Sequence, residues 1–202
     1  MTISLKKGQR VDLTKGNASL NQIMVGLGWD PIQQKSAGGM LGGLFGGSKA
    51  ANIDCDASVI MLQNDKFVNK NDLVYFGNKA SACNSVRHSG DNVTGAGDGD
   101  DEVIMIDLKS IPASYNKLIF VVNIYDCVKR KQDFGMIQNA FIRIVNPATG
   151  AELTRFNLSD NYAGLTTLVT GEIYRHNGEW KFGAIGDGTT DQGLSEIVSK
   201  FQ

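Results

Sequence analysis

The stretch LTTLVTGEIYRHNGEWKFGAIG, from Leu165 to Gly186, decides the fold class. Two runs rich in β-branched and aromatic residues flank the dipeptide Asn177-Gly178, which strongly favours a two-residue hairpin turn. The stretch therefore predicts two antiparallel strands joined directly by a tight turn.

Similar short apolar or alternating segments recur along the chain, and turn-forming residues separate them. One of them, KLIFVVNIYD at 117–126, is almost continuously apolar and predicts a central strand. Strands are expected at 10–13, 21–29, 52–62, 72–76, 102–108, 117–126, 140–145, 151–158, 165–175 and 179–186.

Helical periodicity is clear only at the C-terminus. Leu194, Ile197, Val198 and Phe201 are spaced as on one face of an amphipathic helix, with Asp191 as a possible N-cap. Many short strands, one terminal helix and no alternation of strands with helices predict a mainly β protein. We expect residues 1–202 to form one antiparallel β-sandwich domain with a short C-terminal helix, and the glycine-rich stretch 35–50 to form a flexible surface loop.

Composition excludes several classes of protein. The chain is 42% hydrophobic, 20% charged and has a formal net charge of -1, so no general attraction to nucleic acid is expected. Its longest apolar run is too short to span a membrane, and MTISLKKGQR has no signal-peptide core, so a cytoplasmic location is expected. Three cysteines without a CxxC pair suggest neither a disulfide framework nor a zinc ribbon.

Negative charge is concentrated in HSGDNVTGAGDGDDE, from His88 to Glu102, which has five acidic residues and no lysine or arginine. A second acidic pair, Asp54 and Asp56, lies two residues apart on a predicted strand. Both carboxylates therefore leave the same face of the sheet, roughly 6.6 Å apart along the strand. Like charges at that spacing repel one another unless a cation lies between them.

The residues alone leave several interpretations open: a solvated acidic loop, an Asx-rich turn, an acidic face for a basic partner, or a metal site. For a metal site, hard oxygen ligands on a glycine-rich loop favour calcium over magnesium or zinc. We expect two adjacent calcium ions, or one ion with some carboxylates in an outer shell. The candidate ligands are Asp54, Asp56, Asp91, Asp98, Asp100, Asp101 and Glu102.

The acidic stretch, preceded by NIDCDAS, resembles the signature of the TerD-type tellurium-resistance and stress-response family. VGLGWD, QDFGMIQNAFIRIVN and the segment 166–188 add collinear support, so the resemblance covers nearly the whole chain. It implies a β-sandwich that binds calcium at one end through the seven acidic residues, with Asn92 and Gly97 contributing carbonyl oxygens. The glycine-rich segment 38–47 departs from the family pattern.

Three functions follow as hypotheses. The first is a non-enzymatic calcium-binding protein whose loop 89–102 is ordered by calcium to form a surface for protein partners of a stress-response complex. The second is a two-metal hydrolase acting on a phosphate-containing substrate. The sequence shows no histidine–carboxylate pair, nucleophile motif or phosphate loop for it. The third is thiol chemistry on tellurite through Cys55, Cys83 or Cys127.

Overall fold

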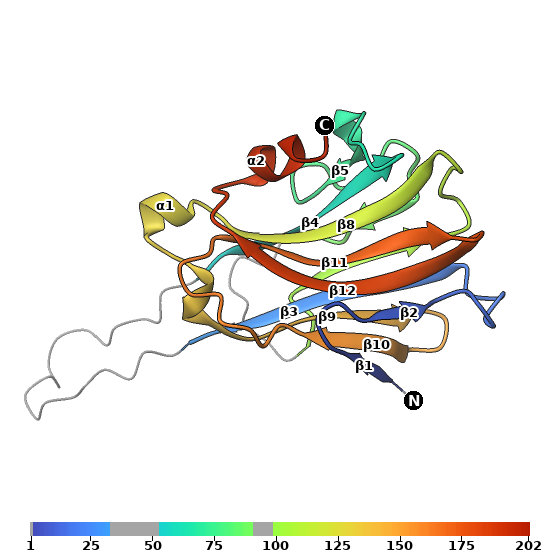
Figure 1. Cartoon of the computed structure of the whole chain (residues 1–202), viewed down its shortest axis with the longest axis horizontal. Coiled ribbons are helices and arrows are strands. Elements are labelled where there is room, and N and C mark those ends of the chain that lie inside the picture. Colours follow the sequence, from blue (N-terminus) through green and yellow to red (C-terminus); the bar gives the residue numbers. More distant parts are fainter. Residues whose placement is uncertain (1, 33–52, 91–98) are drawn as a thin grey trace, which may run out of the picture.

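A computed structural model describes residues 2–32, 53–90 and 99–202 (Figure 1). The described residues form two six-stranded sheets packed face to face, with two short α-helices at their margins. This arrangement confirms the expected mainly β sandwich with a C-terminal helix. The predicted loop at 35–50 lies almost wholly in 33–52, outside the described residues.

The first sheet contains both N-terminal and central segments of the chain. Its strands, in spatial order, are β1 (Ile3–Leu5), β10 (Ala151–Asn157), β9 (Ile137–Asn146), β3 (Gln22–Pro31), β7 (Glu102–Asp107) and β6 (Val86–His88). The β1–β10 pair is parallel, and the other pairs are antiparallel. The strands β1 and β6 are only three residues long and were not foreseen.

The second sheet contains the hairpin that decides the fold class. Its strands, in spatial order, are β2 (Arg10–Asp12), β12 (Glu179–Thr189), β11 (Thr167–His176), β8 (Tyr115–Ile124), β4 (Cys55–Gln63) and β5 (Leu73–Val74). The hairpin turn has positive φ at Asn177 (52°) and Gly178 (81°), as the sequence predicts for a tight antiparallel turn. The apolar strand β8 is internal in its sheet, because it pairs with β11 on one side and β4 on the other.

Strand β4 shows how alternation sets burial. Cys55, Ala57 and Val59 belong to the core between the sheets, whereas Ile60 and Leu62 face outwards and pack beneath α2 (Leu194–Ser199). Because the helix covers this outer face with Ile197 and Val198, both faces of β4 are buried along most of its length. The C-terminal helix is thus held by the apolar face that its sequence predicts.

The N-terminus of α2 differs from the expectation. Its N-cap is Gly193 and makes no side-chain capping bond. Asp191, the expected cap, is instead bonded by the hydroxyl of Thr189 and the ammonium of Lys200. The carboxylate therefore ties the end of β12 to the C-terminal residues rather than capping the helix.

Several strand ends meet at one end of the sandwich, on the left of Figure 1, where α1 (Cys127–Arg130) also lies. The amide of Asp101 donates to the carbonyl of Leu27 at 2.8 Å, and the amide of Tyr125 donates to the carbonyl of Asp54 at 2.8 Å. These bonds join the start of β7 to β3 and the end of β8 to the start of β4. The predicted site residues outside 91–98 lie at this end.

Candidate functional site

The predicted ligands come from two places in the fold. Asp54 and Asp56 lie at the start of β4, and Asp100, Asp101 and Glu102 lie at the start of β7. The remaining predicted ligands fall in the undescribed segment 91–98: Asp91, Asn92, Gly97 and Asp98.

Glu102 links the two sheets of the sandwich through a hydrogen bond to β4. Its Oε2 accepts a hydrogen bond from the amide of Ala57 in β4, although Glu102 itself opens β7 in the other sheet. Nε2 of His88, in β6, lies 3.1 Å from the carbonyl oxygen of Ala57 and 3.4 Å from Oε2 of Glu102. Both polar groups of the Ala57 backbone are therefore satisfied by side chains from the opposite sheet.

The hydrogen bonds of His88 fix its tautomer. The amide of Gly90 donates to Nδ1 at 3.1 Å, so Nδ1 carries no proton and Nε2 bears the hydrogen that points at the Ala57 carbonyl. The sequence analysis was wrong to exclude a histidine–carboxylate pair. His88 and Glu102 are 14 residues apart, and antiparallel pairing of β6 with β7 brings them together.

The other oxygen of Glu102, Oε1, is in a different situation. Oε1 is buried, and no hydrogen bond reaches it within the described part of the chain. A buried carboxylate oxygen without a donor or cation is costly, because it has lost its hydration. A bound cation would supply the missing interaction, so this oxygen fits the expected metal.

Asp101 is also in an unfavourable environment for a charge. Burial raises the pKa of its carboxyl group, and the nearby carboxylates of Asp30, Asp100 and Glu102 raise it further. The backbone amide of Trp29 donates to Oδ2 at 2.7 Å and partly offsets these effects. A cation beside Asp101 would remove the repulsion among the acids.

Four predicted ligands surround one buried thiol. The pKa of Cys55 is raised well above its usual value, first by burial and then by the carboxylates of Asp56, Asp54, Glu102 and Asp101. The fold therefore brings residues from β4 and β7 to the same region, as the sequence analysis expected. A buried thiol among carboxylates stays protonated, so Cys55 is a poor nucleophile.

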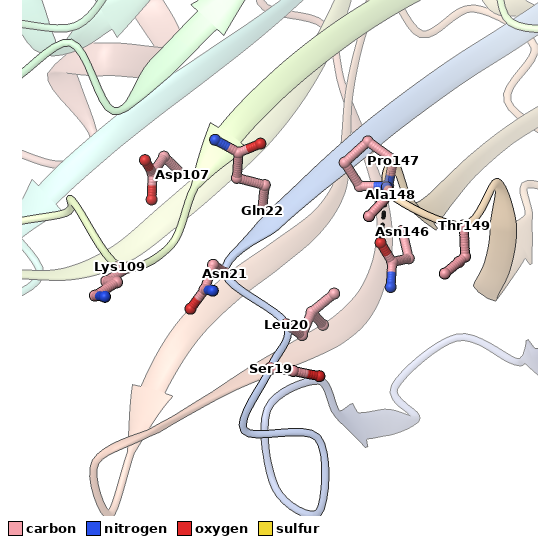
Figure 2. A pocket seen from close by; sticks show the side chains of 10 residues that line it. All are labelled: Ser19, Leu20, Asn21, Gln22, Asp107, Lys109, Asn146, Pro147, Ala148 and Thr149. Atoms are coloured by element: carbon pink, nitrogen blue, oxygen red, sulfur yellow. Dashed lines mark hydrogen bonds between the residues drawn. The ribbon is translucent and has the colours of Figure 1, made fainter.

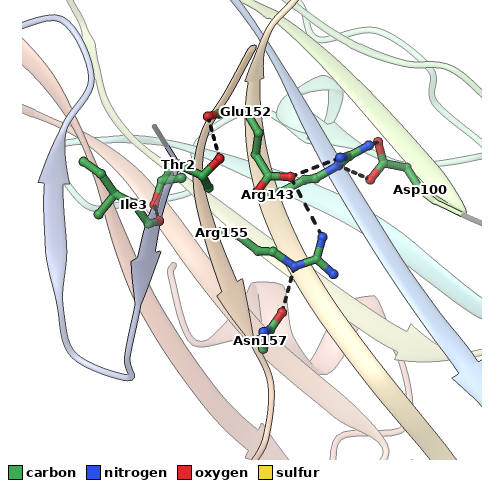
Figure 3. A network of polar contacts seen from close by, with 8 residues as sticks. Thr2, Ile3, Asp100, Arg143, Glu152, Arg155 and Asn157 are labelled. Carbon is green, nitrogen blue, oxygen red and sulfur yellow. Dashed lines mark hydrogen bonds and ion pairs between the residues drawn. The ribbon is translucent and has the colours of Figure 1, made fainter. Parts of the chain in front are cut away.

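The Asp100 carboxylate does not join the four that act on Cys55. It lies over Gly26 of β3 and accepts two hydrogen bonds from Arg143 of β9, at 2.7 Å and 2.9 Å (Figure 3). Arg143 also donates to Glu152 at 3.1 Å. The structure thus holds Asp100 on the outer face of the first sheet through an arginine that sequence reasoning missed.

A second arginine balances the charge of Asp54. Nη1 of Arg130, at the end of α1, lies 3.2 Å from Oδ2 of Asp54. The same guanidinium lies 5.1 Å from the centre of the Tyr125 ring, which favours a cation–π interaction. Both arginines were missed because they are remote from the acidic stretch, and only the strand and loop packing brings them to it.

The described candidate ligands do not form a metal site by themselves. Within residues 2–32, 53–90 and 99–202, no three His, Cys, Asp or Glu side chains are placed together closely enough to hold a metal ion. Calcium takes about six to eight oxygen ligands, so a site here needs donors beyond these residues.

A cavity of about 510 Å³ lies at the opposite end of the β3–β7 ladder, beside Gln22 and Asp107 (Figure 2). Its wall also includes the turn that starts at Asn146. The Asp107 carboxylate already accepts from the amide and hydroxyl of Ser110, and Asn146 accepts from the amide of Ala148. The Asp107 and Asn146 side chains at this cavity are therefore already engaged in local turn contacts.

The α-helices in the described ranges, Cys127–Arg130 and Leu194–Ser199, are far too short to cross a bilayer.

Comparison with known proteins identifies the family of the chain. The chain is 60% identical to stress response protein SCP2 of Bacillus subtilis (strain 168) over 201 residues, covering 100% of both chains. It is 40% identical over 202 residues to tellurium resistance protein TerD of Serratia marcescens, covering 100% of this chain and 97% of that protein.

A solved structure supports the fold alone. The crystal structure of a homologue of the telluride resistance protein TerD from Streptomyces coelicolor matches with a TM-score of 0.65 and 19% identity, covering 91% of this chain and 98% of that chain. The family model for the TerD domain matches residues 1–201. The chain therefore belongs to the TerD domain family of tellurium-resistance and stress-response proteins.

Proposed function

We propose that this chain is a non-enzymatic, cytoplasmic calcium-binding protein of the tellurium-resistance and general stress-response type. Calcium, as two adjacent ions, binds at the end of the sandwich where β4 and β7 begin. Its binding orders the acidic loop 89–102 and creates a surface for protein partners. The names of the relatives, which refer to stress response and tellurium resistance, support the biological setting.

One observation carries the calcium proposal: Oε1 of Glu102 is buried without a donor among the described residues. The carboxylates of Asp54, Asp56 and Asp101 act together with Glu102 on the pKa of the same buried thiol, Cys55. Oxygen donors of this kind suit calcium, which tolerates irregular coordination. When bound, calcium supplies positive charge that compensates the desolvated carboxylates. The predicted ligands in 91–98 would complete the shell.

The chain's own residues prepare this end of the sandwich. Glu102 and His88 hold β4 against the opposite sheet through the Ala57 backbone. Arg130 neutralises part of the charge of Asp54, and Arg143 does the same for Asp100. Asp54 and Glu102 are thus held in place by contacts within the chain, so less of the binding free energy is spent on ordering the starts of β4 and β7.

The two chemical alternatives have no support. In a hydrolase, His88 and Glu102 would be the natural acid–base pair, but both side chains are completely inaccessible. Thiol chemistry on tellurite would need an accessible thiolate, whereas Cys55 and Cys127 are buried. Cys83 is only half-buried, and its sulfur lies 2.9 Å from the hydroxyl of Ser85.

Calorimetric titration with calcium tests the proposal. We expect saturable heat with the native chain, and at least tenfold weaker binding after Asp54→Asn plus Asp56→Asn. The matched control is Asp160→Asn plus Asp187→Asn, which removes two exposed carboxylates near Lys7 and should leave the heats unchanged. Native mass spectrometry with and without a chelator counts the ions. Equal heats in all three proteins would refute the assignment.

A further inference from the structure

A second cavity, of about 420 Å³, opens on the outer face of the second sheet, between the starts of β4 and α2 and the ends of β5 and β8. Its lining combines buried polar groups with aromatic rings. The residues that matter are Asp56, Tyr75, Phe76, Asn123, Tyr125 and Asp126.

The polar floor is formed by Asp56 and Asn123, which face each other in register across β4 and β8. Asp56 is 3% exposed and Asn123 is 7% exposed. Oδ1 of Asn123 has no hydrogen-bond partner among the described residues. A half-turn of the amide exchanges the positions of its oxygen and nitrogen, so this acceptor can face the cavity when a donor is present.

The walls are aromatic and partly exposed. Tyr75 and Phe76 form an edge-to-face pair with ring centres 5.3 Å apart. Phe76 is 36% exposed and Tyr125 is 47% exposed. Large apolar side chains left in water beside a cavity indicate a surface that another molecule covers.

The charge of the cavity is negative. Asp56 and Asp126 are among its lining residues, and no lysine or arginine of the described ranges lines it. Lys129 lies 3.7 Å from Asp126, but its side chain is almost wholly in water, so this pair screens little of the negative charge. A cationic occupant is therefore favoured over an anionic or neutral one.

We propose that this cavity receives an arginine side chain from an apolar segment of a partner protein. A guanidinium group can stack on an aromatic ring and donate to Asp56 and Asn123 in one plane. The surrounding Phe76 and Tyr125 would contact the neighbouring apolar residues of the partner. The chain already contains the same pairing, because Arg130 lies over Tyr125 while it bonds Asp54.

This inference does not rest on the calcium proposal. Asp56 belongs to both sites, whereas Asn123, Phe76 and Tyr125 belong to the cavity alone. Arginine binding is therefore expected in the metal-free protein, and its measurement in excess chelator separates the two proposals. Failure of calcium binding would leave the cavity proposal standing, and the reverse also holds.

Heteronuclear NMR of the isotope-labelled full chain in chelator provides the test, with acetyl-Leu-Arg-Leu-amide as the probe. We expect saturable shifts at the amides of Asn123, Tyr125 and Leu194, with a dissociation constant on the order of 1 mM. Acetyl-Leu-Gln-Leu-amide should bind at least about tenfold more weakly, because it lacks the charge. Equal binding of the two peptides, or no shifts at these residues, would overturn the proposal.

Two surface variants and one control sharpen the result. Tyr125→Ala and Phe76→Ala each remove an exposed ring, and each should weaken the binding of the arginine peptide about fivefold. Val68→Ala removes another exposed apolar side chain, away from the cavity lining, and should have no effect. Tighter binding of spermidine than of the arginine peptide would identify a small polyamine as the occupant and reject a protein partner.

Discussion

Arg143 and Asp100 are joined by two parallel hydrogen bonds, from Nε at 2.7 Å and from Nη2 at 2.9 Å. The Asp100 side chain is only 7% exposed, and hydrogen bonding to Asp100 raises the pKa of the guanidinium. Part of the acidic stretch is thus neutralised by an arginine of the chain itself. A calcium ion bound by Asp100 would compete with Arg143 for the same carboxylate oxygens.

The geometry of this pair predicts that lysine cannot replace Arg143. An ammonium group donates from a single point and cannot hold both Asp100 and Glu152 as the planar guanidinium does. We expect Arg143→Lys to lower the free energy of unfolding by about 1–2 kcal/mol, measured by urea denaturation in chelator. Arg155→Lys, on the more exposed side of the same network, is the control and should cost less.

The close approach of the Asp100 carboxylate to Gly26 predicts a second effect on the Arg143–Asp100 pair. A Cβ atom at this position would lie 2.2 Å from Oδ1 of Asp100, so Gly26→Ala must displace the carboxylate from Arg143. We expect a loss of about 2–3 kcal/mol in urea denaturation. In the control Gly183→Ala, the new Cβ meets Glu172 at an easier 3.3 Å. Equal losses of unfolding free energy in the two variants would show that alanine in a strand is destabilising by itself, without a contribution from the Asp100 contact.

The fold was predictable because its signals are local. The Asn177-Gly178 turn and the apolar run of β8 gave the hairpin and the central strand directly. The short strands β1 and β6 were missed, and three-residue strands carry little periodicity, although β2, of the same length, was foreseen at 10–13. The prediction that Asp191 caps α2 was wrong, because the Asp191 carboxylate bonds Thr189 and Lys200 instead.

For the candidate site, the sequence could name acidic residues but not their surroundings. Clustered charge singled out Asp54, Asp56, Asp101 and Glu102, and packing of the start of β4 against the start of β7 brings all four near the Cys55 thiol. The partners of these acids, His88, Arg130 and Arg143, carry no signal in the sequence that links them to a particular carboxylate. Strand pairing brings His88 to Glu102, strand packing brings Arg143 to Asp100, and the helix α1 brings Arg130 to Asp54. The alternating pattern of AFIRIV does place Arg143 on an outer face, but it does not name Asp100 as the partner.

A buried tyrosine predicts how stability depends on alkaline pH. The Tyr115 hydroxyl donates to Asp72 at 2.8 Å, and burial together with this carboxylate raises the pKa of Tyr115 to about 12. Between about pH 10 and 12, the unfolded chain releases this proton while the folded chain keeps it. The unfolded state then binds fewer protons, so stability falls with rising pH, by about 2–3 kcal/mol in total.

Urea denaturation at several pH values above 9 measures this slope. At pH 8, Tyr115→Phe should be less stable by about 1–3 kcal/mol, because Asp72 loses a donor. Between about pH 10 and 12, its free energy of unfolding should lack the part of the fall that is due to Tyr115. Tyr174→Phe is the control, since Tyr174 is partly exposed and should leave the decline intact. An unchanged slope in Tyr115→Phe would contradict the prediction.

Glu102→Gln should act in opposite directions on stability and on calcium binding. In the metal-free protein, the amide oxygen can still accept from Ala57, and the variant removes a buried charge whose Oε1 has no donor among the described residues. We expect stability in chelator to be unchanged or higher by about 1 kcal/mol. Calcium affinity should fall at least tenfold, because a charged ligand is lost.

Glu102→Ala separates these two roles. It removes the acceptor of the Ala57 amide as well as the charge, so it should be destabilised by about 1–3 kcal/mol even in chelator. Thermal unfolding with and without excess calcium compares the two variants. The native chain should gain about 2.7 kcal/mol when calcium is present at a hundred times its dissociation constant, and both variants should gain less at the same concentration. If Glu102→Gln gained as much as the native chain, Glu102 would serve only to join the two sheets.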